Sequence, residues 1–439
     1  MAAETFGGAT VVIDLGLARG EPDEYARPVG STVPAWFAPV LIAVVVLLSS
    51  AASAAPPPPV LSPLLSLQVG PADPYTLTEG GDLLAQTYGQ LNAYALDDGR
   101  LKWQAGSSSP TYRLRTGGGL VLMRPWSGNR GDPGTTAISL TSGAAQWRRS
   151  GNVVTIPGSA TLLAVSGVRS SSGSGRRVQG TVDAVDPATG STRWQVTVPS
   201  TAVLLGVPGP VGQDPRMLLV HDSRTAAVHD LSTGKQLAGT ALPAADYGPD
   251  NPVVSGGLLL LRHPTPTGRM VSAFDPVTLE QRWSRPAGYA FGVTSCGRLA
   301  CLTGPDGVRA VDLADGLQRW FKAGWRGVEQ RNGMVVAYGT RTGETDPVGV
   351  IDPETGAVLT DLHGWRPVPA SGGGDQLVVT RPADGGGRTM VAIAGPGDAG
   401  PRVLADLPPG TGDCQSAPSR LVCRSSAGDL IVWAYRKKG

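Results

Sequence analysis

The sequence predicts an all-β protein: a β-propeller of four-stranded blades that follows a single apolar helix near the N-terminus. From about residue 70 onward the chain repeats itself every 37 to 47 residues, a spacing typical of propellers, solenoids and repeat arrays. Each repeat contains short stretches in which polar and apolar residues alternate, which indicates strands. No helical pattern interrupts these repeats, which excludes the helical solenoids.

The composition limits the class of protein. The 439 residues include 61 Gly and 38 Pro, 16% are charged, and the net charge is +2. A single hydrophobic core rarely extends beyond about 300 residues, so we expect several domains or a modular array. The near-zero net charge argues against a nucleic-acid-binding protein, because such proteins usually have a large basic excess.

The N-terminal part is predicted to be a membrane anchor. Residues 34–55 carry no charge and as a helix would be about 33 Å long, enough for a hydrocarbon core of about 30 Å. We expect a disordered cytoplasmic tail at 1–33, a transmembrane signal anchor at 34–55, and a proline-rich linker at 56–69 that can also supply a ring-closing strand. The propeller would occupy 70–439.

The orientation of this anchor follows from the nearby basic residues. Two arginines precede the apolar segment, whereas no Lys or Arg follows it until Arg100, which favours a cytoplasmic N-terminus and an extracytoplasmic propeller in the cell membrane. The alternative is secretion after cleavage near Ala54, because residues 52–54 read Ala-Ser-Ala, an A-x-A cleavage site.

The repeats share a turn and a tryptophan. A Gly lies four residues before the Trp in four copies, as Gly190 does before Trp194. An Asp lies four residues before the Gly position in five copies; its carboxylate can accept hydrogen bonds from turn N–H groups, while Gly supplies a positive φ. Two further copies have Ala238 and Thr360 in the Trp position. The repeat residues are Trp103, Trp147, Trp194, Trp283 and Trp320, and Asp186, Asp230, Asp275, Asp312 and Asp352.

The strands around this turn complete a blade. The turn joins two alternating strands, and a continuous apolar run such as 258–263 precedes them. Such a run suits a strand that is buried on both faces, and a weaker strand precedes each run. Four strands per repeat correspond to one propeller blade.

The pattern A/V-x-D-x-x-T-G-x-x-x-W resembles the repeat of PQQ-like (pyrroloquinoline-quinone-type) β-propellers over residues 70–439, in a membrane-anchored bacterial form of the actinobacterial type. The resemblance implies that each Trp packs between neighbouring blades and docks on the turn of the next blade; stacking on a ligand is the alternative. Family members usually have eight blades. Seven clear hairpins, a degenerate one at 390–407 and a composite of 61–69 with 421–436 make nine units. We expect eight blades, with one unit not a separate blade and seven or nine as alternatives.

The four cysteines are predicted to form two local disulfides. Cys296 and Cys301 flank one turn and Cys414 and Cys423 another, each between the first two strands of a blade, where antiparallel neighbours come close enough for S–S geometry. Disulfides fit an exported compartment. Free thiols and a zinc site are the alternatives, although this spacing is unlike that of tetrahedral zinc clusters.

No catalytic, cofactor-binding or metal-binding residue is predicted. The four His are scattered, and the Gly-rich stretches lack the ending of a phosphate loop. We therefore expect a non-enzymatic, membrane-anchored extracellular propeller that binds a protein partner in the cell envelope or elsewhere outside the cytoplasm.

Related propellers have two other functions, one enzymatic and one in envelope assembly. In a PQQ-dependent quinoprotein dehydrogenase, the resemblance would imply PQQ and calcium as cofactors, but the adjacent cysteines of those enzymes are missing and no calcium ligands can be assigned. The envelope-assembly propellers that scaffold outer-membrane protein insertion are lipid-anchored through an N-terminal Cys, whereas no Cys precedes Cys296.

Overall fold

The computed structural model divides the chain into two units, Met1–Pro58 and Pro59–Gly439, and each is considered by itself. The structure describes residues 34, 36–52, 60–107, 111–125, 134–156, 159–166, 180–198, 202–208, 215–221, 224–245, 247–248, 251–341, 344–371, 376–383 and 387–436. The tail predicted at 1–33 lies outside the described residues.

The first unit contains one helix, α1 (Phe37–Ala52), of 16 residues. It begins in the turn after Pro34, where the Phe37 N–H donates to the Pro34 carbonyl at 2.8 Å. Within the described part of the chain, no helix is both long enough and apolar enough to span a membrane. The expected transmembrane helix over 34–55 is therefore not confirmed: α1 is about 24 Å long at 1.5 Å per residue.

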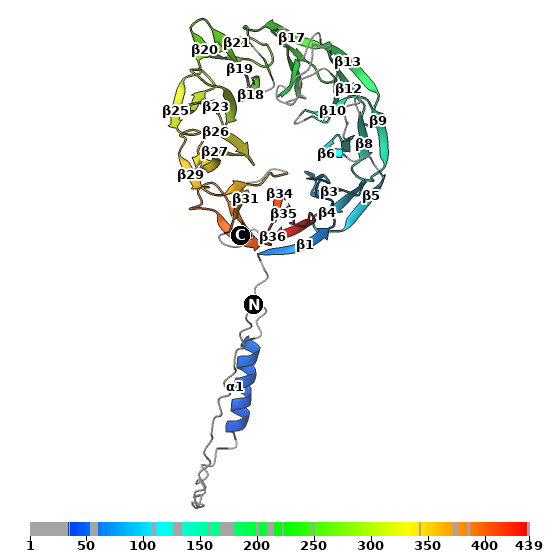
Figure 1. The fold of residues 1–439 in the computed structure, drawn as a ribbon, viewed down its shortest axis with the longest axis vertical. Coiled ribbons are helices and arrows are strands. Elements are labelled where there is room, and N and C mark those ends of the chain that lie inside the picture. Colours follow the sequence, from blue (N-terminus) through cyan, green and yellow to red (C-terminus); the bar gives the residue numbers. More distant parts are fainter. Residues whose placement is uncertain are drawn as a thin grey trace, which may run out of the picture. The chain divides into compact units, whose positions relative to one another are not determined.

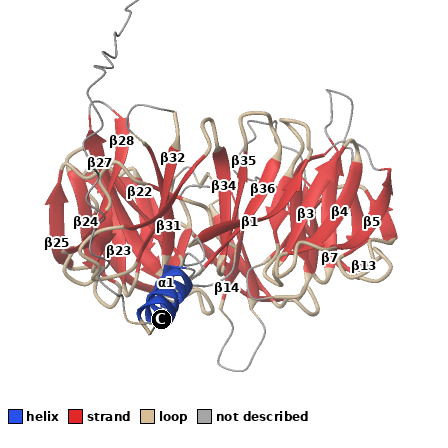
Figure 2. Cartoon of the chain, turned by 90° about the horizontal axis from the view of Figure 1, so that it is seen from below, coloured by secondary structure: helices blue, strands red, loops and turns tan. Residues whose placement is uncertain are grey.

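The second unit is a ring of nine four-stranded antiparallel sheets around a central opening (Figure 1). The strands of each blade run along the ring axis, so that loops emerge at both faces (Figure 2). Blades 1 to 4, each from the innermost strand outward, are β2 (Tyr75–Leu77), β3 (Asp82–Thr87), β4 (Gln90–Ala95) and β5 (Leu101–Ser107); β6 (Thr111–Gly117), β7 (Leu120–Pro125), β8 (Thr135–Ser139) and β9 (Ala145–Arg149); β10 (Asn152–Thr155), β11 (Leu162–Ser166), β12 (Gly180–Val185) and β13 (Thr192–Val198); and β14 (Ala202–Val207), β15 (Arg216–His221), β16 (Thr225–His229) and β17 (Gln236–Ala241).

Four more blades follow, and a ninth closes the ring. Blades 5 to 8 are β18 (Val253–Ser255), β19 (Leu258–Thr265), β20 (Gly268–Phe274) and β21 (Gln281–Pro286); β22 (Gly292–Cys296), β23 (Leu299–Gly304), β24 (Gly307–Asp312) and β25 (Gln318–Ala323); β26 (Gly327–Arg331), β27 (Met334–Arg341), β28 (Glu344–Ile351) and β29 (Val358–Asp361); and β30 (Arg366–Pro367), β31 (Leu377–Pro382), β32 (Thr389–Ala394) and β33 (Arg402–Leu407). Blade 9, the closing blade, is β34 (Gly412–Ala417), β35 (Arg420–Arg424), β36 (Leu430–Tyr435) and β1 (Leu61–Leu67).

The closing blade takes strands from both ends of the ring sequence. Strand β1 is its outermost strand and pairs antiparallel with β36, from Leu61 opposite Tyr435 to Leu67 opposite Leu430. In Figure 1 the blue β1 lies beside the red β36. The predicted ring-closing strand within 61–69 is thus present, and it supplies the fourth strand of the blade that joins the two ends of the ring.

The expected number of eight blades is wrong. The structure has nine, because the degenerate hairpin at 390–407 belongs to a complete blade, blade 8. This blade has lost the repeat Asp and Trp, but it keeps the apolar pattern: Val379 and Val391 are fully buried. A blade forms wherever that pattern provides two apolar faces for its neighbours, whether or not the turn motif is present.

The cores lie between blades. The apolar second strands are almost completely buried, as Leu83–Gln86 of β3 are, and the buried clusters combine two neighbouring blades. One cluster joins Leu163 and Val182 of blade 3 to Met217 and Leu219 of blade 4. A single blade would leave such faces in water, so stability comes from stacking.

Five blades are connected to the next blade by a repeat tryptophan. Each indole Nε1–H donates to a backbone carbonyl in the β-turn of the following blade. The pairs are Trp103 with Leu140 (2.8 Å), Trp147 with Pro187 (2.8 Å), Trp194 with Leu231 (3.1 Å), Trp283 with Leu313 (2.7 Å) and Trp320 with Pro353 (2.9 Å). The indole also lies against the turn Gly: a Cβ on Gly143, whose φ is +71°, would come within 2.5 Å of Trp103. Only Gly fits this contact and this φ.

Four of the nine junctions lack the repeat tryptophan, and those after blades 4 and 7 each have a substitute. After Ala238 in blade 4, the next turn has Leu279 in place of Gly; its side chain is 3% exposed and packs in the cluster that Ala238 contacts. Leu279 keeps the turn conformation at φ +60°. After Thr360 in blade 7, the threonine hydroxyl donates to the Gly395 carbonyl at 2.7 Å, which replaces the indole hydrogen bond.

The repeat aspartates stabilise the same turns. In the turn of blade 3, Asp186 accepts hydrogen bonds from the N–H groups of Ala188 (2.9 Å) and Thr189 (3.0 Å), and from the Arg193 guanidinium at 2.6 Å. The Arg193 hydrogen bond, followed by those N–H groups, lowers the pKa of Asp186 to about 2. The Arg282 hydrogen bond outweighs partial burial and lowers the pKa of Asp275 to about 2.

We expect Trp283→Ala to lower the free energy of unfolding by roughly 3–5 kcal/mol, because it removes a buried aromatic side chain and its hydrogen bond. At the junction without Trp, Ala238→Trp should cost roughly 1–3 kcal/mol by overpacking against Leu279, and the double variant Ala238→Trp/Leu279→Gly should recover most of that loss. Chemical denaturation of the variants tests this coupling; additive effects would contradict it.

The low pKa of Asp275 predicts an acid-dependent stability. A carboxylate whose pKa is lower in the folded state stabilises the fold fully above pH ~4, and this stabilisation is lost as the pH falls toward 2. The melting temperature of Asp275→Asn should therefore fall less than that of the wild type between pH 4 and 2. Arg282→Gln should move the acid transition to higher pH. Parallel pH profiles for all three proteins would show that the ion pair contributes nothing.

Candidate functional site

The two faces of the ring carry different loops. Because the strands are antiparallel, the turns after the first and third strands emerge at one face, which we call the turn face. The hairpins after the second strand and the blade-to-blade connections emerge at the other, which we call the connection face. The Asp-Gly turns that receive the tryptophans all belong to the turn face.

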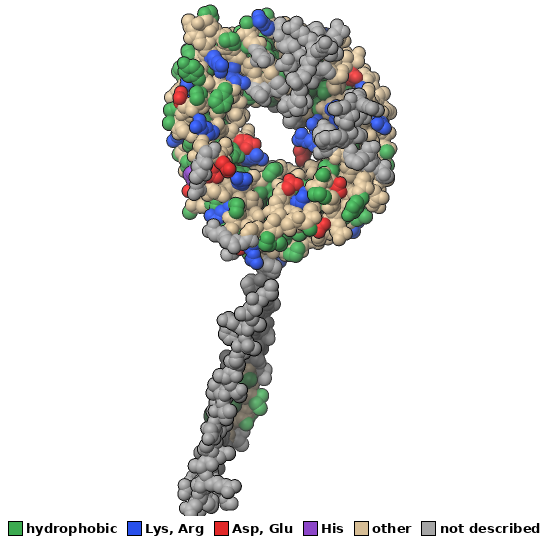
Figure 3. All heavy atoms as spheres, in the orientation of Figure 1, with side chains coloured by type: hydrophobic (Ala, Val, Ile, Leu, Met, Phe, Trp, Pro, Cys, Tyr) green, Lys and Arg blue, Asp and Glu red, His purple; other side chains and the backbone are tan. Residues whose placement is uncertain are grey.

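A polar cavity of about 580 Å³ opens at the centre of the ring, where the closing blade meets blades 1 to 3. The space-filling view shows acidic and basic side chains bordering the central opening (Figure 3). The cavity is lined by Pro71, Ala72, Asp73, Pro74, Tyr75, Thr76, Arg113, Leu114, Arg115, Thr116, Thr155, Asp413, Gln415 and Arg424. They come from innermost strands β2, β6, β10 and β34, from the end of β35 and from the connection into blade 1.

Arg424 organises this cavity. Its guanidinium donates to the carbonyls of Gly70 and Asp73, both at 2.8 Å, and lies 3.4 Å from an Asp413 carboxylate oxygen. It also stacks over the Tyr75 ring, 5.5 Å from its centre. The side chain of Arg424 is only 13% exposed, against 64% for Asp413. Arg424 therefore holds blade 1 to the closing blade, and Asp413 is the more accessible charge.

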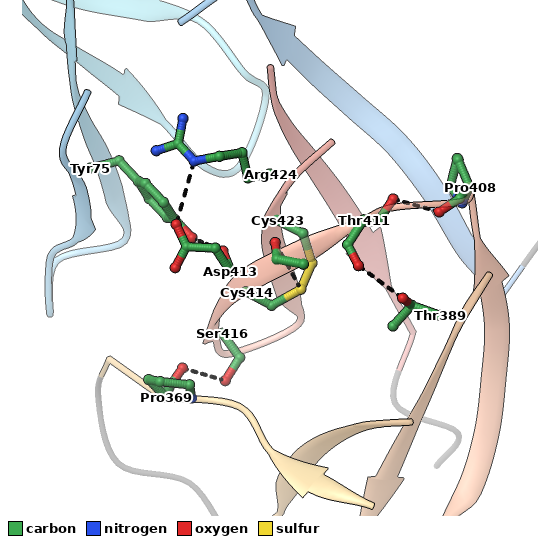
Figure 4. Close-up of a disulfide and its surroundings, with 11 residues drawn as sticks. Tyr75, Pro369, Thr389, Pro408, Thr411, Asp413, Cys414, Ser416, Cys423 and Arg424 are labelled. Carbon is green, nitrogen blue, oxygen red and sulfur yellow. Dashed lines mark hydrogen bonds and ion pairs between the residues drawn. A yellow bond between two sulfur atoms is a disulfide. The ribbon is translucent and has the colours of Figure 1, made fainter. Parts of the chain in front are cut away.

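The Cys414–Cys423 disulfide lies beside the Asp413 side of this cavity (Figure 4). Strand β34 has a bulge between Gly412 and Gln415, and the bridge joins this bulge to β35. Asp413 lies in the bulge with a φ of +44°, and its carbonyl accepts the Tyr75 hydroxyl. The crosslink thus fixes the segment that presents Asp413 to the cavity.

The chemistry of the cavity suits binding. Burial and the nearby Asp413 raise the pKa of Tyr75 well above its ordinary range, so the phenol stays protonated at neutral pH and cannot act as a base. Tyr338 of blade 7 also has a raised pKa. Its hydroxyl donates to Glu329 at 3.0 Å, and Glu329 pairs with Arg331 at 2.9 Å. Burial and Glu329 raise the pKa of Tyr338 to about 12.

One histidine–serine pair has the spacing of a catalytic pair. His263 Nε2 lies 2.8 Å from Ser272 Oγ, which donates to Ser284 Oγ at 2.8 Å. Ser272 is 1% exposed, and His263 Nδ1 has no hydrogen-bond partner in the described part of the chain. A nucleophile needs access to substrate and a base that is held in position, so this pair is part of the sheet packing.

The sequence-predicted residues do not gather at one place. Cys296 and Cys301 are bonded to each other within the first two strands of blade 6 and are fully buried, while the other bridge reaches the cavity. The repeat Trp and Asp residues lie at blade junctions and turns. Among the described residues no group of three or more His, Cys, Asp or Glu could hold a metal ion.

The sequence did not single out Tyr75, Arg113, Asp413 and Arg424. They share no motif, and Tyr75 and Arg424 are separated by nearly the whole ring. The only feature that they share is their position: Tyr75, Arg113 and Asp413 lie in the first three residues of innermost strands, which the sequence predicts only weakly.

Comparison with known proteins supports the repeat assignment. Residues 178–323, from blade 3 through blade 6, match the family model described as outer membrane protein assembly factor BamB. The predicted PQQ-like repeat is thereby confirmed over these residues, and the described blades form a β-propeller. The comparison with curated proteins finds no match.

Solved structures show likeness at low identity. BamB from Moraxella catarrhalis is 15% identical, with 87% of this chain and 99% of that chain covered and a TM-score of 0.43. A quinohemoprotein alcohol dehydrogenase from Pseudomonas putida HK5 is 13% identical, with 60% and 61% covered and a TM-score of 0.39. A eukaryotic initiation factor is 10% identical, with 82% and 92% covered and a TM-score of 0.56. At these identities likeness concerns the fold alone.

We expect the double variant Cys414→Ser/Cys423→Ser to lose roughly 2–3 kcal/mol of unfolding free energy, the usual range for a small closed loop. It should also exchange amide hydrogens faster around residues 70–76, because the bulge that contacts Tyr75 loses its crosslink. Cys296→Ser/Cys301→Ser is the matched control: it should lose similar stability without that local effect. Quantitative alkylation of all four thiols in exported wild-type protein would contradict both bridges.

Proposed function

We propose that this chain is a non-enzymatic β-propeller that binds a protein partner outside the cytoplasm and serves as a scaffold in the cell envelope. The observation that carries the proposal is the match of residues 178–323 to the model of an outer membrane protein assembly factor. Propellers of this class offer two broad loop-lined faces on a rigid ring, a form well suited to holding partners.

The chemistry of the ring supports binding over catalysis. In the central cavity, Arg424 is engaged by two carbonyls and Asp413, and the Tyr75 phenol stays protonated. These groups can hold a polar partner but offer no activated nucleophile. We propose that the chain uses neither PQQ nor calcium.

The proposed location is supported by the cysteines and the N-terminal segment. All four cysteines are bonded, and structural disulfides persist in oxidising compartments. We propose that the apolar residues at 34–55 direct export and that the ring lies outside the cytoplasm.

The proposal is tested on the full chain in its native cells. After fractionation and crosslinking, the tagged protein should have oxidised cysteines, lie outside the cytoplasm, and carry a reproducible envelope-protein adduct. Purified protein titrated with PQQ and calcium should show no new visible absorbance and no dye reduction. Reduced cytoplasmic protein would overturn the location, and tight PQQ binding with dye reduction would overturn the non-enzymatic role.

A further inference from the structure

The connection face of blades 5 and 6 carries large aromatic side chains in water. Tyr289 is 77% exposed, Phe291 55% and Phe321 44%. The first two lie on the connection from β21 to β22, and Phe321 lies on β25 opposite Arg309 of β24. With Arg262, Arg269 and Arg309 they form what we call the aromatic–arginine surface. Exposed aromatic clusters of this kind mark interaction sites in stable proteins.

Two hollows shape this surface. A hollow of about 100 Å³ is lined by Tyr289, Phe321, Arg309 and the hairpin at 304–307. A second hollow, of about 360 Å³, is lined by Arg262, His263 and Arg269. Ala290 belongs to both, so the hollows adjoin along the 287–291 connection. In Figure 3, basic and hydrophobic side chains are both exposed in this sector of the ring.

The connection between the hollows is held in place. The Phe291 N–H donates to the Thr303 carbonyl at 2.9 Å, and the Ala287 N–H donates to the Arg269 carbonyl at 2.8 Å. Arg262 donates to the Phe291 carbonyl. The aromatic side chains are thus presented by a fixed backbone, so a partner would lose little entropy in ordering it.

The charge of this surface is one-sided. Among the described residues that line the two hollows, Asp306 is the only acidic one, against three arginines. Arg269 and Arg309 form no ion pair with another described residue. On the turn face, by contrast, the repeat arginines are paired, as Arg282 is with Asp275 and Arg319 with Asp312. Unneutralised guanidinium groups beside aromatic rings favour a partner that supplies carboxylates and apolar side chains.

We propose that the aromatic–arginine surface binds an extended acidic segment of a partner protein. An apolar side chain of that segment would enter the smaller hollow beside Phe321, and Asp or Glu side chains would pair with Arg269 and Arg309. This inference rests on the proposed binding function and identifies its surface and the chemistry of its partner.

The first test uses the full chain and a fluorescein-labelled peptide of about ten residues in which Asp and Glu surround one Phe and one Leu. The control peptide replaces the acids by Asn and Gln. Fluorescence anisotropy should give a Kd at least roughly tenfold lower for the acidic peptide, rising with salt. Equal affinity for the two peptides would overturn the proposal.

Variants locate the site. Arg269→Glu and Arg309→Glu should each weaken acidic-peptide binding at least roughly tenfold, the loss typical of a central interface arginine, and Phe321→Ser should weaken it at unchanged salt dependence. Arg402→Glu, on the exposed outermost strand of blade 8, is the matched control and should bind like the wild type. Melting temperatures confirm folding. Equal losses in all variants, or tighter binding of single-stranded RNA that ignores Phe321, would show a mere polyanion effect and contradict the proposal.

A photocrosslinker separates this inference from the proposed function. Placed at Tyr289 in cells, it should form an adduct with an acidic segment that is lost in Arg269→Glu/Arg309→Glu. Placed at Tyr88, an exposed tyrosine on the hairpin of blade 1, it should not. An adduct at Tyr88 alone would leave the binding function standing and overturn this surface, whereas no envelope partner by any route would overturn the function itself.

Discussion

The contact between a tryptophan and the turn of the next blade is the interaction on which the ring depends. Each indole N–H donates a hydrogen bond to a backbone carbonyl of the neighbouring turn. The indole ring also lies against a turn Gly, which has no Cβ. The contact constrains the distance and tilt between two neighbouring blades. It occurs at five of the nine junctions and so contributes to the curvature of more than half of the ring. Because the apolar cores also lie between blades, neither feature is satisfied in an isolated blade. The ring folds as a whole or leaves apolar faces exposed.

Closure then determines where a site can form. Strand β1 completes the closing blade, and Arg424 and the Cys414–Cys423 bridge fasten that blade to the start of blade 1. The buried Arg424 and the Cys414–Cys423 bridge therefore lie at the junction between the two ends of the ring sequence. The polar cavity is a consequence of this junction, because Tyr75 and Arg424 meet only when the ring is closed.

The sequence predicted the parts of the fold that repeat and missed those that do not. The Trp and Asp columns, the local cysteine pairs and the strand at 61–69 all follow from local patterns, and the structure places them as blade junctions, turns, bridges and β1. The count of blades failed at 390–407, where apolar side chains remain without the turn motif. The transmembrane prediction rested on hydrophobicity over 34–55, while α1 covers 16 residues. The cavity and the aromatic–arginine surface combine residues from several blades and connections that belong to no column of the repeat.

The two faces of the ring are under different structural constraints for a physical reason. On the turn face, each repeat must place an Asp, a Gly and the receiving carbonyl where a tryptophan can dock, so its arginines are held by those aspartates. The loops of the connection face do not have to receive a tryptophan. They need only connect an outermost strand to the next innermost strand. Residues there can change without cost to the blade junctions, and it is there that Tyr289 and Phe291 are exposed to solvent. The turn face thereby keeps the frame of the ring constant, and variation in the sequence is accommodated at the connection face.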